Sequence, residues 1–442
     1  MRPLLKGRRV ELQIRHPERN PGEKREQGQS EISRDTDRAA INSVRGENLI
    51  RNKLSIPLSR PDITEREIAA IIDVLKTPYL SLGPKLGEFE EKFAAYIGAK
   101  YAVAVSSGTS GLHLAVKSLG IGENDAVITT PFSFIASANC ILYEKALPVF
   151  VDIETATCNI DPSQVEEYLR TNCERDRKTG RPIDRKTGRN VSALLPVHVF
   201  GEPCGMAKLG QLAEEYHLAV IEDACEATGS EYEGKKVGTF GDVAVYAFYP
   251  NKQMTTGEGG IIVTDREDIA ALCRSLRNQG RDNQGGWLAH RRLGFNYRIS
   301  DINCALGIAQ LERIGEILRK REGVAARYSE LLRGAVRVPE PQSGARRSWF
   351  VYVVHLVGDQ YKGFRMQILE ELAGAGIGCS NYFPPIHLQP FYQETFGYRE
   401  GDYAITEDIA ARTIALPFHN NLTTEEIEYV AATLKDILRG LQ

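Results

Sequence analysis

A lysine and an aspartate are the two side chains of this sequence whose types and surroundings best suit covalent chemistry. Lys252 lies in a turn rich in glycine and threonine, between two apolar segments, and Asp223 directly follows an earlier apolar segment. A lysine amine in such a place can form a Schiff base with an aldehyde. A carboxylate can keep a pyridine nitrogen protonated, so that the ring accepts electrons. The pair therefore predicts chemistry with pyridoxal 5′-phosphate.

Both residues have ordinary alternatives. Most lysine side chains are solvated at the surface, but Pro250 and Gly257 give Lys252 a constrained turn. Asp223 could instead cap the next helix; we favour the pyridine role because a buried carboxylate needs a cationic partner. Glu226, three residues further on, could bond the cofactor's 3-hydroxyl or the substrate, or could be an acid in the first turn of a helix.

Two further segments could hold the cofactor. Ser106–Ser110 joins a predicted strand to a predicted helix, and free N–H groups at a helix start, beside Gly108, form an anion site for a phosphate. Serine and threonine also cap ordinary helices, so this signal alone is weak. Phe132 and Phe134 follow the next predicted strand. Either ring could stack on the pyridine, although a core position is the commoner one for phenylalanine.

Short apolar runs alternate with helical patterns through the first three hundred residues. This alternation predicts an α/β fold with a doubly wound, mostly parallel sheet, in which ligands bind beyond the carboxyl ends of the strands. The segments with candidate chemistry each follow one of these runs closely. The predicted strands are Tyr101–Val105, Ala126–Thr129, Val149–Asp152, Ala193–Val199, Ala219–Glu222, Val243–Phe248 and Gly260–Thr264.

The chain divides into a tail and two domains. Residues 1–54 are polar and charged with almost no aromatic content, so they predict a disordered tail. Residues 55–300 form the predicted large domain, in which the segment 174–190 is a polar insert. The insert repeats the motif Asp-Arg-Lys-Thr-Gly-Arg and predicts a surface hairpin or loop. Residues 301–442 form a smaller α/β domain.

Several element boundaries are also predicted. Thr64 with Glu67, and Thr423 with Glu426, have the spacing of helix-capping boxes. The remaining predictions are a helix from Asp301 to about Arg321 followed by a second one, a strand at Trp349–Val357, a helix from about Phe364, and a last helix that stops at Gly440.

Composition excludes several classes of function. The formal net charge is −3, which gives no basic excess for nucleic acid. The eight cysteines have neither CxxC pairs nor zinc-ligand spacing, so we expect no metal and a reduced, cytoplasmic protein. The longest uncharged run, Ala126–Tyr143, contains Pro131 and several hydroxyls and does not predict a membrane span. His198 and His355 lie in or beside apolar runs, where core or edge positions are expected.

Five motifs of the chain, taken in order, resemble the DegT/DnrJ/EryC1/StrS family of sugar aminotransferases. The likeness runs from about residue 55 to the C-terminus. The motifs are Ser107-Gly108-Thr109, Glu222-Asp223-Ala224, Ala247 to Gly260 around Lys252, Gly294-Phe295-Asn296-Tyr297-Arg298, and Tyr382-Phe383-Pro384-Pro385-Ile386-His387.

The resemblance implies the fold-type-I architecture of pyridoxal phosphate enzymes and a homodimer with active sites at the subunit interface. It implies transfer of an amino group from an amino acid, usually glutamate, to a keto sugar that is commonly nucleotide-linked, in amino-deoxysugar or polysaccharide biosynthesis. By the same resemblance, Lys252 is the Schiff-base lysine and Asp223 the partner of the pyridine nitrogen. The other implied cofactor contacts are Gly108, Thr109, Phe134 and, to the neighbouring subunit's phosphate, Asn296.

The sequence departs from the family pattern at two positions. Ala247 stands where many members carry a serine that touches the phosphate, so that contact is missing or supplied elsewhere. Glu226 stands where many have glutamine or histidine, a variant that resembles the perosamine-synthase-like branch acting on 4-keto sugars. Two alternatives stay open: a lyase or dehydratase on the same scaffold, and a non-catalytic regulatory protein. Lys252 argues against both, because a related dehydratase branch has histidine there and a binding protein needs no such amine.

Overall fold

A central sheet carries all seven predicted strands. The computed structural model describes residues 55–282, 289–340 and 342–441, and the tail predicted at 1–54 lies outside the described residues. In spatial order the strands are β1 (Tyr101–Val105), β11 (Gly260–Thr264), β10 (Val243–Ala247), β7 (Ala219–Asp223), β6 (Asn190–Leu194), β2 (Asp125–Thr129) and β3 (Leu147–Phe150). Among these seven strands, β11 is antiparallel to its neighbours β1 and β10, and the pairs from β10 to β3 are parallel.

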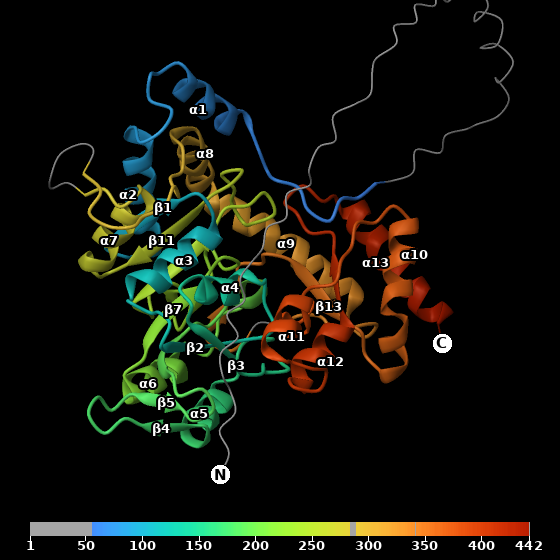
Figure 1. Ribbon diagram of the computed structural model, residues 1–442. Coiled ribbons are helices and arrows are strands. Elements are labelled where there is room, and N and C mark those ends of the chain that lie inside the picture. The colour runs from blue at the N-terminus through green and yellow to red at the C-terminus, as the bar shows by residue number, and fades with distance from the viewer. Residues whose placement is uncertain (1–54, 283–288, 341, 442) are drawn as a thin grey trace, which may run out of the picture. The chain divides into compact units, whose positions relative to one another are not determined.

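Helices cover both faces of this sheet (Figure 1). One face packs against α3 (Gly108–Ser118), α4 (Ala136–Tyr143) and α7 (Glu267–Arg277). The other packs against α2 (Pro84–Ile97), α5 (Pro162–Thr171), α6 (Met206–Tyr216) and α8 (Asp301–Glu312). Side chains alternate along each strand, so Val103 and Val105 of β1 enter the first core and Ala102 and Ala104 the second. The doubly wound α/β prediction is confirmed.

The predicted strand Ala193–Val199 is shorter than expected. β6 ends at Leu194, and Pro196 has no N–H for the ladder. The pairing with β7 resumes only as an isolated bridge between Val197 and Asp223, in which the His198 N–H donates to the Asp223 carbonyl at 3.1 Å. This bridge still fixes the end of β7.

The helix predicted from Asp301 to about Arg321 is wrong in its extent. α8 ends at Glu312, and α9 runs from Ile314 to Leu332. Arg313 lies between them, and its buried guanidinium contacts Glu67 at 2.8 Å and Asp62 at 3.3 Å. Gly315 follows the break by two residues, but the ion pairs of Arg313 with Asp62 and Glu67 that accompany it are tertiary.

The first helix exposes its apolar side. α1 (Glu65–Leu75) has the predicted capping box between Thr64 and Glu67 and packs against α8. Its buried residues are Glu67 and Val74, whereas several large apolar side chains from this helix and the segment after it are exposed in the single chain. They are Ile68, Ile72, Leu75, Tyr79, Leu80 and Leu82.

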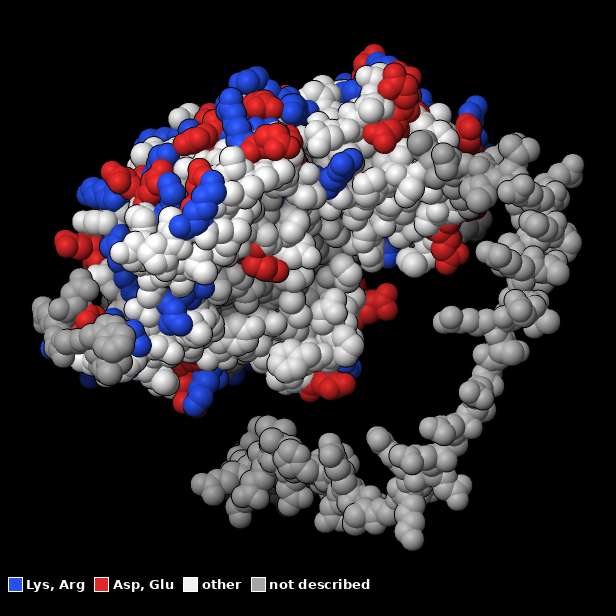
Figure 2. Space-filling model, turned by 90° about the horizontal axis from the view of Figure 1, so that it is seen from above, with Lys and Arg blue, Asp and Glu red and all other residues white. Residues whose placement is uncertain are grey.

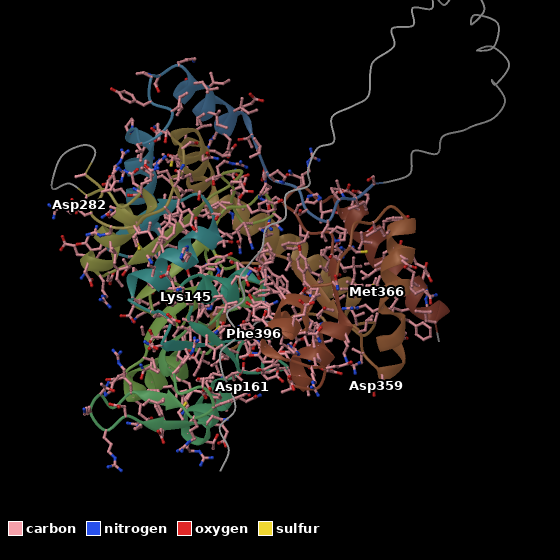
Figure 3. All side chains as sticks on the ribbon, viewed as in Figure 1. Lys145, Asp161, Asp282, Asp359, Met366 and Phe396 are labelled. Carbon is pink, nitrogen blue, oxygen red and sulfur yellow. The ribbon has the colours of Figure 1, made fainter. Side chains whose placement is uncertain are left out.

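The C-terminal residues build a second core. α9, α10 (Arg365–Gly374), β13 (Tyr352–His355), β14 (Thr413–Leu416) and α13 (Thr424–Gly440) share one apolar cluster. α13 has the predicted capping box at Thr423. α11 (Pro390–Phe396) and α12 (Ala404–Arg412) follow η3 (Ile386–Leu388), and Phe396, labelled in Figure 3, packs with Phe150 of β3. Residues 53–442 cluster as one unit, and the division at residue 300 stays a prediction.

The insert forms the predicted surface hairpin. β4 (Cys173–Arg175) pairs antiparallel with β5 (Pro182–Asp184). Both copies of the repeated motif make the same turn: Asp176 accepts from the Thr179 N–H at 2.7 Å, and Asp184 accepts from the Thr187 N–H at 2.9 Å. The remaining short elements are η1 (Val199–Gly201), β8 (Glu231–Tyr232), β9 (Lys235–Lys236), β12 (Ala345–Arg346) and η2 (Asp359–Phe364).

Candidate active site

A cavity of about 540 Å³ lies where the carboxyl ends of the strands meet the C-terminal part of the chain. The loops after β1, β2, β7 and β10 form its walls, as the strand order predicts. Every predicted site residue except Asn296 lines it, together with the variant position Ala247. They are Gly108, Thr109, Phe134, Asp223, Glu226 and Lys252.

The Lys252 turn directs its amine into this cavity. The Lys252 N–H donates to the Tyr249 carbonyl at 2.9 Å, and Gly257 has a φ of +81°, which favours glycine. Nζ lies 3.5 Å from Oε1 of Glu226 and 3.8 Å from the ring centroid of Phe350. The side chain is only 13% exposed, so the amine is held beside a carboxylate and over an aromatic face rather than in bulk water.

The Asp223 carboxylate is buried at the end of β7. Oδ2 accepts from the Ser137 hydroxyl at 2.7 Å, and Oδ1 accepts from the Cys225 N–H at 3.1 Å. Within the described ranges, no lysine, arginine or histidine forms an ion pair with it. A buried carboxylate without a cation has a large electrostatic cost. This site therefore suits a ligand that brings a protonated ring nitrogen.

At the start of α3, the backbone lies very close to the neighbouring strands β10 and β11. A Cβ on Gly108 would lie 2.7 Å from the Ala247 Cβ, and a Cβ on Gly260 would lie 2.6 Å from the carbonyl of Ser107. The first N–H groups of a helix have no partner within it, and those of Gly108 and Thr109 belong to residues that line the cavity. An amine, an unpaired buried carboxylate and a helix start in one cavity fit pyridoxal phosphate.

Glu226 faces both the lysine and the backbone. Its Oε2 accepts from the Phe200 N–H at 2.9 Å. Burial raises the pKa of Glu226 above its ordinary value, and the nearby Asp223 charge acts in the same direction, while Lys252 opposes both. The carboxyl group can therefore accept from or donate to a polar ligand atom beside the amine.

Comparison with known proteins decides the family. The model of the DegT/DnrJ/EryC1/StrS aminotransferase family matches residues 61–435. The chain belongs to this family. It is a pyridoxal phosphate-dependent sugar aminotransferase with the fold-type-I architecture.

Three relatives of this aminotransferase are informative. GDP-perosamine synthase of Caulobacter vibrioides is 37% identical over 391 residues, which is 87% of this chain and 98% of the relative. The structure of Helicobacter pylori PseC, an aminotransferase involved in pseudoaminic acid biosynthesis, matches with a TM-score of 0.79 and 26% identity, covering 88% of this chain and all of PseC. The PLP form of Spr1654 from Streptococcus pneumoniae matches with a TM-score of 0.80 and 25% identity over 88% of this chain and all of Spr1654.

Asn296 lies outside the cavity of its own chain. Its side chain is exposed, and its backbone bridges to Asn278. Phe134 lines the cavity and is nevertheless 60% exposed, which contrasts with the fully buried Phe132. The two phenylalanines are thereby distinguished: Phe132 is the core residue and Phe134 the accessible ring.

Sequence reasoning missed three cavity residues of this aminotransferase. Ser137 lies in the first turn of α4, three residues after Phe134 in the segment that follows a predicted strand, a signal that could have been used. Phe350 had no local signal, because only tertiary packing brings it to Lys252. Tyr382 was part of a recognised motif but received no role. His387 of that motif lies outside the cavity and pairs with Glu407 at 2.9 Å.

Among the helices of the described ranges, none combines the length and the apolar character that spanning a membrane requires.

Proposed function

We propose that this aminotransferase moves an amino group from an amino acid, with glutamate as the first candidate, to a nucleotide-linked keto sugar. The observation that carries the proposal is the cavity in which Lys252, Asp223 and the start of α3 meet. The similarity to GDP-perosamine synthase, whose name denotes a nucleotide-linked sugar, supports the acceptor class. The product would serve amino-deoxysugar or polysaccharide biosynthesis.

Each cavity residue has a proposed role. Pyridoxal phosphate, when bound, supplies an electron-accepting ring. Lys252 would hold the cofactor through its aldehyde, and its free amine would serve as the base that moves a proton at the donor's Cα. Asp223 holds the ring nitrogen. Glu226 bonds the 3-hydroxyl or the incoming sugar.

The remaining cofactor contacts are proposed on burial and position. Backbone N–H groups of Gly108 and Thr109 hold the phosphate, since a helix start attracts anions. The accessible ring of Phe134 stacks on the pyridine face. With Ala247 in place of a serine, the phosphate relies on these N–H groups and on a contact from a second subunit.

We propose that the second subunit contributes Asn296 in a homodimer. Several large apolar side chains between residues 63 and 82 are 41–58% exposed in the single chain. Figure 2, seen from the end of the molecule where α1 lies, shows wide areas without charged side chains among the charged ones. Clustered exposed apolar groups mark association surfaces. The eight free cysteines fit a reducing compartment, and we propose a cytoplasmic location.

The decisive experiment measures the visible absorption spectrum of the protein and follows an isotope label from the amino donor into the sugar product. Protein supplied with pyridoxal phosphate should show a visible absorption band that Lys252→Ala abolishes. Nitrogen from ¹⁵N-glutamate should appear in the sugar product when nucleotide-linked 3- and 4-keto sugars are screened by mass spectrometry. Loss of the sugar oxygen without nitrogen incorporation would reject the transfer in favour of a dehydratase.

A further inference from the structure

A second cavity, of about 400 Å³, shares no lining residue with the active site. It lies between the loop 156–158, which follows β3, and the chain from the end of α9 to β13. The acidic Glu340 is part of its lining, and, unlike the first cavity, it is also lined by three arginine residues. They are Arg333, Arg337 and Arg347.

The three guanidinium groups are not equally neutralised. Arg347 is buried and pairs with the buried Glu202 at 2.6 Å. Arg333 approaches Glu340 at 3.8 Å in an exposed pair, which contributes little. Arg337 pairs with no carboxylate of the described residues, and its guanidinium donates to the carbonyl of Thr155 at 2.8 Å. The cavity therefore keeps an uncompensated positive charge at Arg337.

Arg337 has a fixed neighbour. It forms an isolated antiparallel bridge with His355, with both backbone hydrogen bonds made, at 2.9 and 3.0 Å. Directly opposed residues of an antiparallel pair put their side chains on the same face. Nδ1 of His355 is buried and has no hydrogen-bond partner among the described residues. Arg337 and His355 thus both line the cavity, although Nδ1 of His355 is itself covered by surrounding atoms.

We propose that this second cavity binds the phosphate group of a small ligand through Arg337 and Arg333, beside His355. Guanidinium groups bind phosphate oxygens through paired, charge-assisted hydrogen bonds. A phosphate group carries about 1.5 to 2 negative charges at pH 7 and several acceptor oxygens, so both the Arg337 and the Arg333 guanidinium group can bond to it.

His355 can report on ligand binding in this cavity. Burial, with Arg337, Arg347 and Arg412 acting in the same direction, lowers the pKa of His355 to about 4. A bound phosphate would oppose these three positive charges. The pKa of the His355 imidazole should then rise. This rise can be measured without any assay of catalysis.

Calorimetry on the protein loaded with pyridoxal phosphate tests the proposal. Loading fills the phosphate position of the active site, so that added inorganic phosphate reports on the second cavity. At constant ionic strength, Arg337→Gln should weaken phosphate binding about tenfold or more, as expected for a lost charged hydrogen bond. Arg319→Gln removes the same charge from an exposed position of α9 and should leave binding unchanged. Equal affinities in wild type, R337Q and R319Q, or no binding by the wild type, would overturn the proposal.

Two further measurements keep the test decisive. Arg337→Lys retains the charge and should keep more affinity than R337Q, which covers the case in which the glutamine variant folds poorly. In NMR titrations, phosphate should raise the pKa of the His355 imidazole, and an unchanged pKa at saturating phosphate would contradict the site. A parallel titration with a hexose monophosphate separates the sources: tighter binding than that of inorganic phosphate assigns the cavity to phosphate esters, and weaker binding to free phosphate.

Discussion

The Asp223 carboxylate depends on one side-chain hydrogen bond, which Ser137 donates at 2.7 Å. Removing a buried hydrogen bond costs about 1–3 kcal/mol, so Ser137→Ala should weaken pyridoxal phosphate binding about tenfold while the fold is kept. A titration with pyridoxal phosphate, followed by absorbance, measures this affinity. Ser118→Ala, which removes a hydroxyl bonded to the Ala115 carbonyl on α3, should not change the affinity. Equal affinities in both variants would show that Ser137 does not hold the acid.

His355 makes stability depend on pH. Burial comes first among the causes that lower its pKa from 6.5 to about 4. The unfolded chain therefore binds more protons at this residue between pH 6.5 and 4, and the free energy of unfolding should fall as pH falls through that window. The loss is at most about 3 kcal/mol. Denaturant unfolding at pH 7 and pH 5 should show a smaller difference in His355→Gln than in wild type.

The control for this measurement is His290→Gln, because His290 is exposed. That variant should keep the wild-type dependence on pH. If His355→Gln kept it as well, another group would have to account for the loss of stability in acid.

Between elements, β11 closely approaches the turn from β1 to α3 near the site. A Cβ on Gly260 would overlap the Ser107 carbonyl at 2.6 Å and the Gly108 nitrogen at 2.7 Å. Gly260→Ala should therefore destabilise the protein by about 1–3 kcal/mol and weaken cofactor binding, because the turn must shift. Thermal unfolding and cofactor titration measure the two effects.

Gly323→Ala is the matched control for that substitution. Gly323 lies within α9, and a Cβ there would meet no atom within 4 Å. Alanine should stabilise this helix by roughly 0.5–1 kcal/mol. An unchanged melting temperature for Gly260→Ala would mean that the approach of β11 is looser than its geometry indicates.

For the whole molecule, the proposed dimer predicts complementation between two defective chains. Lys252→Ala removes the amine, and Asn296→Ala removes the contact proposed to reach the other subunit's phosphate. A heterodimer of the two variants contains one site with both residues intact, so co-expression should restore activity that neither variant has alone. Mixed chains no more active than the better homodimer would place the action of Asn296 within its own chain, or exclude the role.

Much of this protein could be predicted from local signals. Alternating apolar runs gave all seven central strands, and the spacing of Thr64 and Glu67 gave a helix start, because these patterns depend on residues that are neighbours in sequence. The glycine-rich turn indicated Lys252, and positions shortly after predicted strands indicated Asp223, Glu226, Gly108 and Thr109, whereas the family resemblance favoured Phe134. All six residues line the cavity. Motif order identified the family, which the family model confirms.

Only tertiary structure decided the contacts between distant segments. The ion pairs of Arg313 accompany the break between α8 and α9, Ser137 reaches Asp223, and Phe350 covers Lys252. Each partner lies far away in the chain, so no periodicity or capping rule indicates it. The pairing of Arg337 with His355 is of the same kind: sequence determines which residues carry charge, whereas packing determines which of those charges lie next to each other and which lack a partner.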